Sequence, residues 1–182
     1  MAHSQDPRET AGLCFSAERL LFAPVRRADA VEMTRVLADL ALYQFVGGRP
    51  PTRAELAARY RRWELRRSDD GREEWLNWIM RRSDDRTAIG TVQATISDRG
   101  RRADVAWVVG LAWQGRGYAS EAARALVAWL DARGVGVITA HVHPDHRASQ
   151  AVARSAGLLP TDAVEGGEVV WRRSLHQRSS GR

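Results

Sequence analysis

Residues 103–122 read ADVAWVVGLAWQGRGYASEA. The first part, 103–109, is apolar, β-branched and aromatic, which predicts a largely buried strand. The alanine-rich part after Gly117 predicts the beginning of a helix. Between them, Gly115 and Gly117 allow backbone conformations that a Cβ would resist and a close approach to a ligand. The free N–H groups and the positive dipole end of the new helix favour a pyrophosphate at this turn.

Two widespread phosphate-binding motifs do not fit this turn. Ser120 stands where the third glycine of G-x-G-x-x-G would be, and the chain has no lysine for a P-loop. The pattern Q/R-x-x-G-x-G/A does fit, through Gln114, Gly117 and Ala119. It resembles the acyl-CoA-binding motif of the GNAT N-acetyltransferases, and more narrowly it is similar to their ribosomal-protein-acetyltransferase branch. The resemblance covers residues 20–171 and is strongest over 103–157.

This resemblance implies an α/β (α+β) GNAT fold with a mixed, mostly antiparallel sheet of about six or seven strands and about four helices. Two neighbouring parallel strands should splay, and the acyl chain of CoA should enter the gap between them. Acetyl-CoA, or another acyl-CoA, is the implied co-substrate. The resemblance places the CoA contacts on Val108, Val109, Leu111, Gln114, Gly115, Arg116, Gly117, Tyr118, Ala119, Ser120, His146 and Ser149.

Acetyl transfer to an amine needs a base for the ammonium proton, a donor that polarises the thioester carbonyl and an acid for the leaving thiolate. In the family's second motif, N-x-x-S, His146 replaces the Asn and Ser149 matches the Ser. The tyrosine that many members use as the acid is absent, so Ser149 is the expected acid. Asp104 matches an acidic strand position and is the expected base. His141 and His143 share a strand face and are the alternative bases.

The segment 141–146, HVHPDH, spells H-x-H-x-D-H, the zinc signature of metallo-β-lactamase-like hydrolases. Imidazoles and a carboxylate at this spacing can bind zinc. That fold needs further His and Asp ligands downstream, and the only histidine that follows is His176. The sequence therefore predicts no metal site.

Local patterns predict the remaining elements. Strands are expected at 19–25, 74–81, 88–96, 137–143, 158–161 and 168–173, with turns that imply an antiparallel meander. Asp29 should cap a helix that carries Val31 to Leu40, and Thr52 with Glu55 should form a capping box for a helix over 53–67. A short helix is expected at 147–156. The strand–helix–strand unit around residue 118 predicts a parallel, right-handed crossover.

The length of 182 residues suits one domain, expected over 16–174, with a flexible segment 1–15 and a disordered tail 175–182. The apolar runs are far shorter than the ~20 residues of a membrane span. The lone Cys14 excludes an internal disulfide and fits a reducing cytoplasm. The formal charge is +6. Arginines cluster in the helix over 53–67, either on a solvated face or as a basic rim of the substrate site: Arg59, Arg61, Arg62, Arg66 and Arg67.

The sequence thus predicts an acyl-CoA-dependent N-acyltransferase, most simply an acetyltransferase. Its acceptor would be the primary amine of a small molecule or of a protein N-terminus, and the protein would be a monomer or a homodimer. The alternative is an RNA-associated protein, either a GNAT-like transferase that uses aminoacyl-tRNA or an inactive RNA-binding module. The intact motif at 114–119 favours CoA, whereas the arginine cluster and His146 keep the tRNA alternative open.

Overall fold

The computed structural model describes residues 12–174 as one eight-stranded sheet in the order β1-β2-β3-β4-β5-β6-β8-β7. The sequence predicts about six or seven strands. The additional strand in the structure is the two-residue β1, which no sequence pattern marks. The strands are β1 (Phe15–Ser16), β2 (Leu20–Pro24), β3 (Glu74–Arg82), β4 (Ala88–Ser97), β5 (Arg102–Val109), β6 (Val137–Val142), β7 (Leu159–Glu165) and β8 (Glu168–Ser174).

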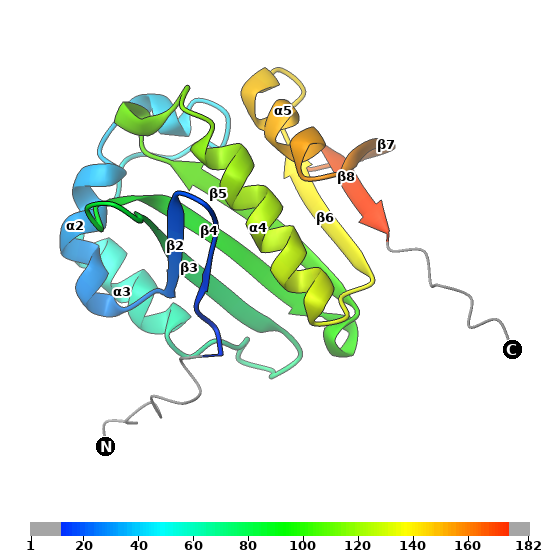
Figure 1. The fold of residues 1–182 in the computed structure, drawn as a ribbon, viewed down its shortest axis with the longest axis horizontal. Coiled ribbons are helices and arrows are strands. Elements are labelled where there is room, and N and C mark those ends of the chain that lie inside the picture. Colours follow the sequence, from blue (N-terminus) through cyan, green and yellow to red (C-terminus); the bar gives the residue numbers. More distant parts are fainter. Residues whose placement is uncertain (1–11, 175–182) are drawn as a thin grey trace, which may run out of the picture.

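One pair of neighbouring strands is parallel, as predicted, and the others are antiparallel. β5 and β6 pair only from Arg102↔Val137 to Asp104↔Thr139. β5 nevertheless continues to Val109 and β6 to Val142 without further pairing. The two strands therefore splay apart beyond Asp104 (Figure 1), and their facing edges are not paired with each other there.

Helices cover both faces of the sheet. α4 runs across one face, and α2 and α3 lie on the opposite face (Figure 1). The helices are α2 (Ala30–Val36), α3 (Arg53–Trp63), α4 (Tyr118–Ala132) and α5 (Arg147–Ser155), with 3₁₀ turns η1 (Arg27–Asp29), η2 (Leu40–Tyr43), η3 (Asp98–Gly100) and η4 (Leu111–Trp113).

The beginning of α3 is as predicted, but two helix ends differ from the expectation. The Thr52–Glu55 capping box is present, with Glu55 N donating to Thr52 Oγ1 at 3.3 Å and Thr52 N donating to Glu55 Oε2 at 2.8 Å. α3 ends at Trp63, so Arg66 and Arg67 lie beyond it. α2 ends at Val36, and Leu40 is exposed in η2 because the chain turns before it could face the core.

The predicted cap at Asp29 is also different. Its carboxylate makes no capping bond to α2; instead its Oδ2 accepts from Arg26 N at 2.7 Å and its Oδ1 pairs with Arg81 at 3.1 Å. A 3₁₀ turn that comes directly before the helix moves this side chain away from the helical amides.

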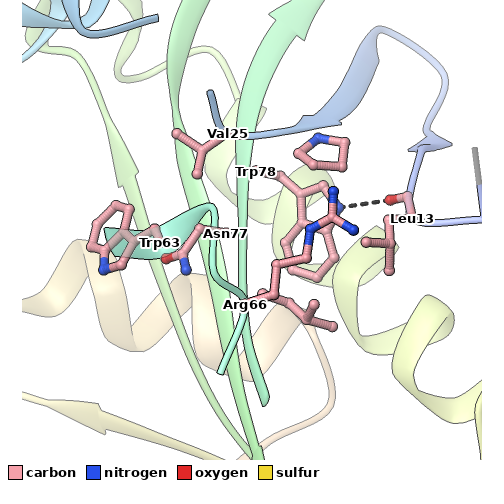
Figure 2. Close-up of a pocket in the computed structure, with 8 residues that line it drawn as sticks. Leu13, Val25, Trp63, Arg66, Asn77 and Trp78 are labelled. Carbon is pink, nitrogen blue, oxygen red and sulfur yellow. Dashed lines mark hydrogen bonds between the residues drawn. The ribbon is translucent and has the colours of Figure 1, made fainter. Parts of the chain in front are cut away.

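Side chains alternate between the two faces of the sheet along each strand, and each face forms its own hydrophobic core. One includes Trp78 and packs against Leu126 and Leu130 of α4, whereas Ile79 belongs to the other, under α2 and α3. Figure 2 shows this alternation at β3, where Trp63 and Asn77 lie on one side and Trp78 and Leu13 on the other. The indole of Trp78 donates to Leu13 O at 2.7 Å.

Residues 12–15, assigned by sequence to a flexible segment, include this Leu13, which is buried. The remainder of that segment, 1–11, and the expected tail 175–182 lie outside the described residues. In the part of the chain that is described, no helix has the length and apolar character needed to cross a bilayer.

Candidate acyl-CoA site

The carboxyl end of β5 lies very close to β4. Gly90 opposes Val109 in the ladder, and a Cβ on Gly90 would lie 2.1 Å from Val108 O and 2.6 Å from Met80 Cε. Gly110 N donates to Ile89 O at 2.8 Å and ends the pairing. Val109 points into the α4 core and Val108 packs toward α2 and α3. The end of β5 is thus held in place by β4 along one edge. The other edge of β5 faces the gap.

The turn after β5 has the conformation that its two glycines predict. Gly115 has φ +73° and Gly117 has φ +80°, both in the left-handed region that favours glycine. The side chain of Gln114 folds back, and its Nε2 donates to Val109 O at 3.0 Å. Gln114 therefore ties the turn to the end of β5. Leu111 and Arg116 are exposed beside it.

The amides at the beginning of α4 form a cradle for an anion. The first helical hydrogen bond runs from Glu121 N to Gly117 O at 3.0 Å, so the amides of Tyr118, Ala119 and Ser120 have no acceptor within the helix. Gly117 is the N-cap residue and offers no side chain as an acceptor. The open amides and the helix dipole suit the pyrophosphate of CoA.

An ion pair that sequence reasoning missed braces this cradle. Glu121 is 7% exposed, and its carboxylate accepts from the backbone N and the Nε of Arg19, both at 2.7 Å. The same guanidinium donates to Arg116 O at 3.2 Å and lies 4.7 Å from the ring centroid of Tyr118. Arg19 is about one hundred residues away in sequence, so no local pattern reveals the pair.

Arg19→Gln should destabilise the protein by about 1.5–3 kcal/mol, the usual range for hydrogen bonds to charged groups. The substitution leaves the Glu121 carboxylate without its guanidinium partner and frees the Arg116 carbonyl. We also expect weaker acetyl-CoA binding, because the turn loses its brace. Urea unfolding and calorimetric titration measure the two effects. Arg124→Gln, an exposed change on the same helix, is the control; an equal loss in both variants would contradict this role.

The other side of the gap carries two histidines and a phenylalanine. His143 follows β6 directly, and His146 lies at the N-cap of α5. The ring of Phe45, which follows η2, stacks on His146 with centroids 4.3 Å apart and lies 5.3 Å from His143. Ser149 is half-buried in the first turn of α5, and within residues 12–174 its hydroxyl makes no hydrogen bond.

Burial lowers the pKa of His146 below its usual value, and the neighbouring His143 lowers it further. The folded protein therefore binds fewer protons than the unfolded chain just below the unfolded pKa of about 6.5. Stability should fall as the pH drops through this range and should be insensitive to His146 at higher pH.

Melting temperatures measured between about pH 5 and pH 8 check this expectation, since they bracket the histidine pKa. His146→Gln should flatten the acid side of the profile. His141→Gln is the control, because it removes an imidazole from β6 that does not contact Phe45. An unchanged profile in His146→Gln would show that this imidazole does not couple to folding.

Asp104 lies at the last paired position before the strands part. Thr139 Oγ1 donates a short hydrogen bond to its Oδ1, and the carboxylate is otherwise exposed. Asp104 and Val109 are five positions apart, a distance of roughly 16 Å along an extended strand. Strand alternation places His141 and His143 on the same sheet face as Asp104, progressively farther along the gap.

The two histidines differ in their hydrogen bonds. His141 Nε2 lies 3.1 Å from Glu165 Oε2, and since a carboxylate only accepts, this nitrogen carries a proton. In contrast, His143 Nδ1 accepts from Asp145 N at 3.1 Å. His143 therefore carries its proton on Nε2 in this arrangement. Despite the H-x-H-x-D-H spacing, residues 12–174 contain no group of three side chains placed to hold a metal ion.

The structure thus gathers most of the residues singled out by sequence around one gap. Val108, Val109 and the turn 114–120 form one side, and His143, His146 and Ser149 form the other. Asp104 lies at the closed end of the gap.

Comparison with known proteins agrees with this geometry. A family model described as an acetyltransferase (GNAT) domain matches residues 19–159, whereas no curated protein matches the chain. A GNAT acetyltransferase from Bacillus anthracis is 16% identical, with a TM-score of 0.73 and coverage of 88% of this chain and 98% of its own.

Two further solved structures share the fold at low identity. An acetyltransferase from Agrobacterium tumefaciens is 22% identical, with a TM-score of 0.68 and coverage of 89% of this chain and 94% of its own. The ribosomal L7/L12 α-N-protein acetyltransferase RimL, solved with coenzyme A, is 15% identical, with a TM-score of 0.72 and coverage of 89% and 98%. The family match spans more than half of the sequence, and the chain belongs to the GNAT acetyltransferase family.

Proposed function

We propose that this protein transfers an acyl group, in the first place acetyl, from acyl-CoA to a primary amine. The observation that carries the proposal is the combination of the splayed β5–β6 pair with the open amides at the beginning of α4. The amides of Tyr118, Ala119 and Ser120 would bind the pyrophosphate. The unpaired edge of β5 near Val109 would orient the acyl end and polarise its carbonyl.

The reaction is a direct transfer. The neutral amine nitrogen forms a bond to the thioester carbonyl carbon, the carbon–sulfur bond breaks, and the nitrogen loses a proton while the thiolate gains one. Ser149 is the proposed donor to the thiolate, because its hydroxyl makes no hydrogen bond within residues 12–174 and α5 borders the gap. A serine hydroxyl that gives up its proton must recover one from solvent or from a neighbouring group.

Asp104 is the proposed proton acceptor. Its carboxylate is exposed and oriented by Thr139, and its distance from Val109 requires water to relay the proton. His143, the other candidate base, has its Nδ1 occupied by Asp145 N and would first have to release that bond. His141 is better arranged than His143, because its Nε2 faces Glu165 and its Nδ1 makes no hydrogen bond within the described residues, so a neutral imidazole could accept a proton there.

The acceptor would be a small-molecule amine or a protein N-terminus, and transfer from aminoacyl-tRNA is the alternative. Thermal shift separates these cases, because a ligand that binds only the native state raises the melting temperature. Acetyl-CoA should raise it at physiological salt, and bulk tRNA should have no effect that survives added salt. A shift with tRNA and none with acetyl-CoA would favour the RNA-associated function.

A further inference from the structure

A groove of about 560 Å³ opens on the sheet face that α3 borders. α3 contributes one wall, which includes Arg59, Arg62 and Trp63, and the strands β3 and β4 form the floor. This face is opposite to the one that α4 covers, so the groove is separate from the amide cradle. Figure 2 shows two residues of its edge, Trp63 and Asn77, on one side of β3.

The groove is positively charged and has aromatic walls. Its charged lining residues are Arg59 and Arg62, and none of the described residues that line it is acidic. The Arg62 guanidinium lies 5.3 Å from the ring centroid of Trp75, and the Arg59 guanidinium lies 6.0 Å from that of Trp63. Stacking on the indole rings restricts the positions of the guanidinium groups and leaves their N–H groups available to a ligand.

Neighbouring carboxylates do not neutralise these arginines. Asp69 approaches Arg62 only to 3.9 Å and is 87% exposed, so this ion pair is weak and screened. Glu73 does not line the groove, and its Oε2 accepts from the indole of Trp75 at 3.0 Å and fixes that ring. Among the described residues Arg59 makes no ion pair and Arg62 makes only the weak one with Asp69, so both guanidinium groups are available to a ligand anion.

The floor of the groove runs toward the β5–β6 gap. Gln93 and Thr95 of β4 line the groove and pair directly with Ala106 and Asp104 of β5. Directly opposed residues of antiparallel strands share a sheet face. Since strands lie about 4.8 Å apart, β3, where Arg62 covers the ring of Trp75, and β5, which borders the gap, are roughly 10 Å from each other. A molecule in this groove could reach the gap over polar, uncovered strand residues.

We propose that the groove selects amine acceptors that carry a carboxylate or a phosphate at the end remote from the amine. This inference rests on the proposed acyl transfer. Arg59 and Arg62 bind the anion, the chain of the acceptor lies over Gln93, and the amine enters the gap on the Val109 side of Asp104, where water connects it to the Asp104 carboxylate. Both anions suit a guanidinium pair, and the flat tryptophan surfaces accept an apolar chain.

A matched set of acceptors tests this proposal: aminohexanoate, aminohexyl phosphate and the neutral aminohexanamide. They share the amine and the chain and differ only at the remote group. Transfer is followed by the release of CoA thiol from acetyl-CoA. Charge-assisted hydrogen bonds are stronger than neutral ones, so we expect a kcat/KM for the anionic acceptors at least about tenfold above that for the amide. The ratio between the two anions identifies which one the groove prefers.

The double variant Arg59→Gln, Arg62→Gln should reduce the preference to about one, with acetyl-CoA binding unchanged. Arg61→Gln is the matched control, since this exposed arginine lies on α3 outside the groove and should retain the preference. Equal kcat/KM values for all three acceptors in the wild type would overturn the proposal. So would an equal loss in the control, or a double variant that loses only tRNA binding.

Calorimetric titration of the same three compounds without acetyl-CoA keeps this test independent of the transfer reaction. If acetyl-CoA fails to bind and no amine is acetylated, the proposed function is wrong. The groove proposal still stands if the anionic compounds bind the wild type and not the double variant. It fails if the amide binds as tightly as the two anions.

Discussion

Gly117→Val is expected to abolish the rise in melting temperature that acetyl-CoA produces in the wild-type protein. A ligand at a hundred times its Kd stabilises the native state by about 2.7 kcal/mol, so the wild-type shift should be several degrees. Gly117 has φ +80° and precedes the open amides of α4. A valine there is strained in that conformation, and its Cβ would lie 3.5 Å from Arg19 Nη2, beside the amides proposed to bind the pyrophosphate.

Gly134→Val separates loss of the site from loss of stability. Gly134 follows the other end of α4 with φ +82°, and a Cβ there meets nothing within 4 Å. Both variants should melt earlier by a similar amount because both place a side chain in the left-handed region. Only Gly117→Val should lose the acetyl-CoA shift. Normal acetyl-CoA binding by folded Gly117→Val would disprove the assignment of the cradle.

Ser149→Ala should lower kcat by about 10²–10⁴-fold, the range typical of general acids and bases, with little change in acetyl-CoA binding. The hydroxyl faces no partner within the described residues, so its removal should not disturb the fold. Ser155→Ala removes a hydroxyl from the other end of α5, where it donates to Val152 O at 2.7 Å, and should leave kcat unchanged. A kcat within about threefold of wild type, well below the general-acid range, would exclude Ser149 from the mechanism.

Asp104→Asn should have a different signature. The substitution keeps the size of the side chain but removes the proposed base, so kcat should fall most at low pH. The deficit should shrink as the pH rises, because more of the amine is then already neutral. A deficit that does not change with pH would assign Asp104 a structural role beside Thr139. His141, held by Glu165, would then be the next residue to replace.

The sequence was informative where local chemistry dictates local structure. The β-branched run before Gly110 predicts β5, the two glycines predict the left-handed turn, and Thr52 with Glu55 predicts the beginning of α3. The strand patterns, in which apolar residues alternate with polar ones, are short but consecutive, and they predict the antiparallel meander. The single parallel pair follows from the length of the connection through α4.

Features that depend on contacts distant in sequence could not be predicted. The Arg19–Glu121 pair joins residues that no periodic pattern relates. The stacking of Phe45 on His146 and the orientation of His141 by Glu165 likewise come from the packing of separate segments. The sequence shows the arginine cluster, but the packing of α3 over β3 and β4 decides that Arg59 and Arg62 line the groove.

Incubation with isotope-labelled acetyl-CoA and a panel of primary amines tests the central claim most directly. The amount of labelled amide and the amount of free CoA thiol are measured in the same reaction. Direct transfer predicts equal amounts of the two, with none in the absence of an amine. Thiol release without labelled amide would indicate hydrolysis instead, and no reaction with any amine would contradict acyl transfer from acyl-CoA.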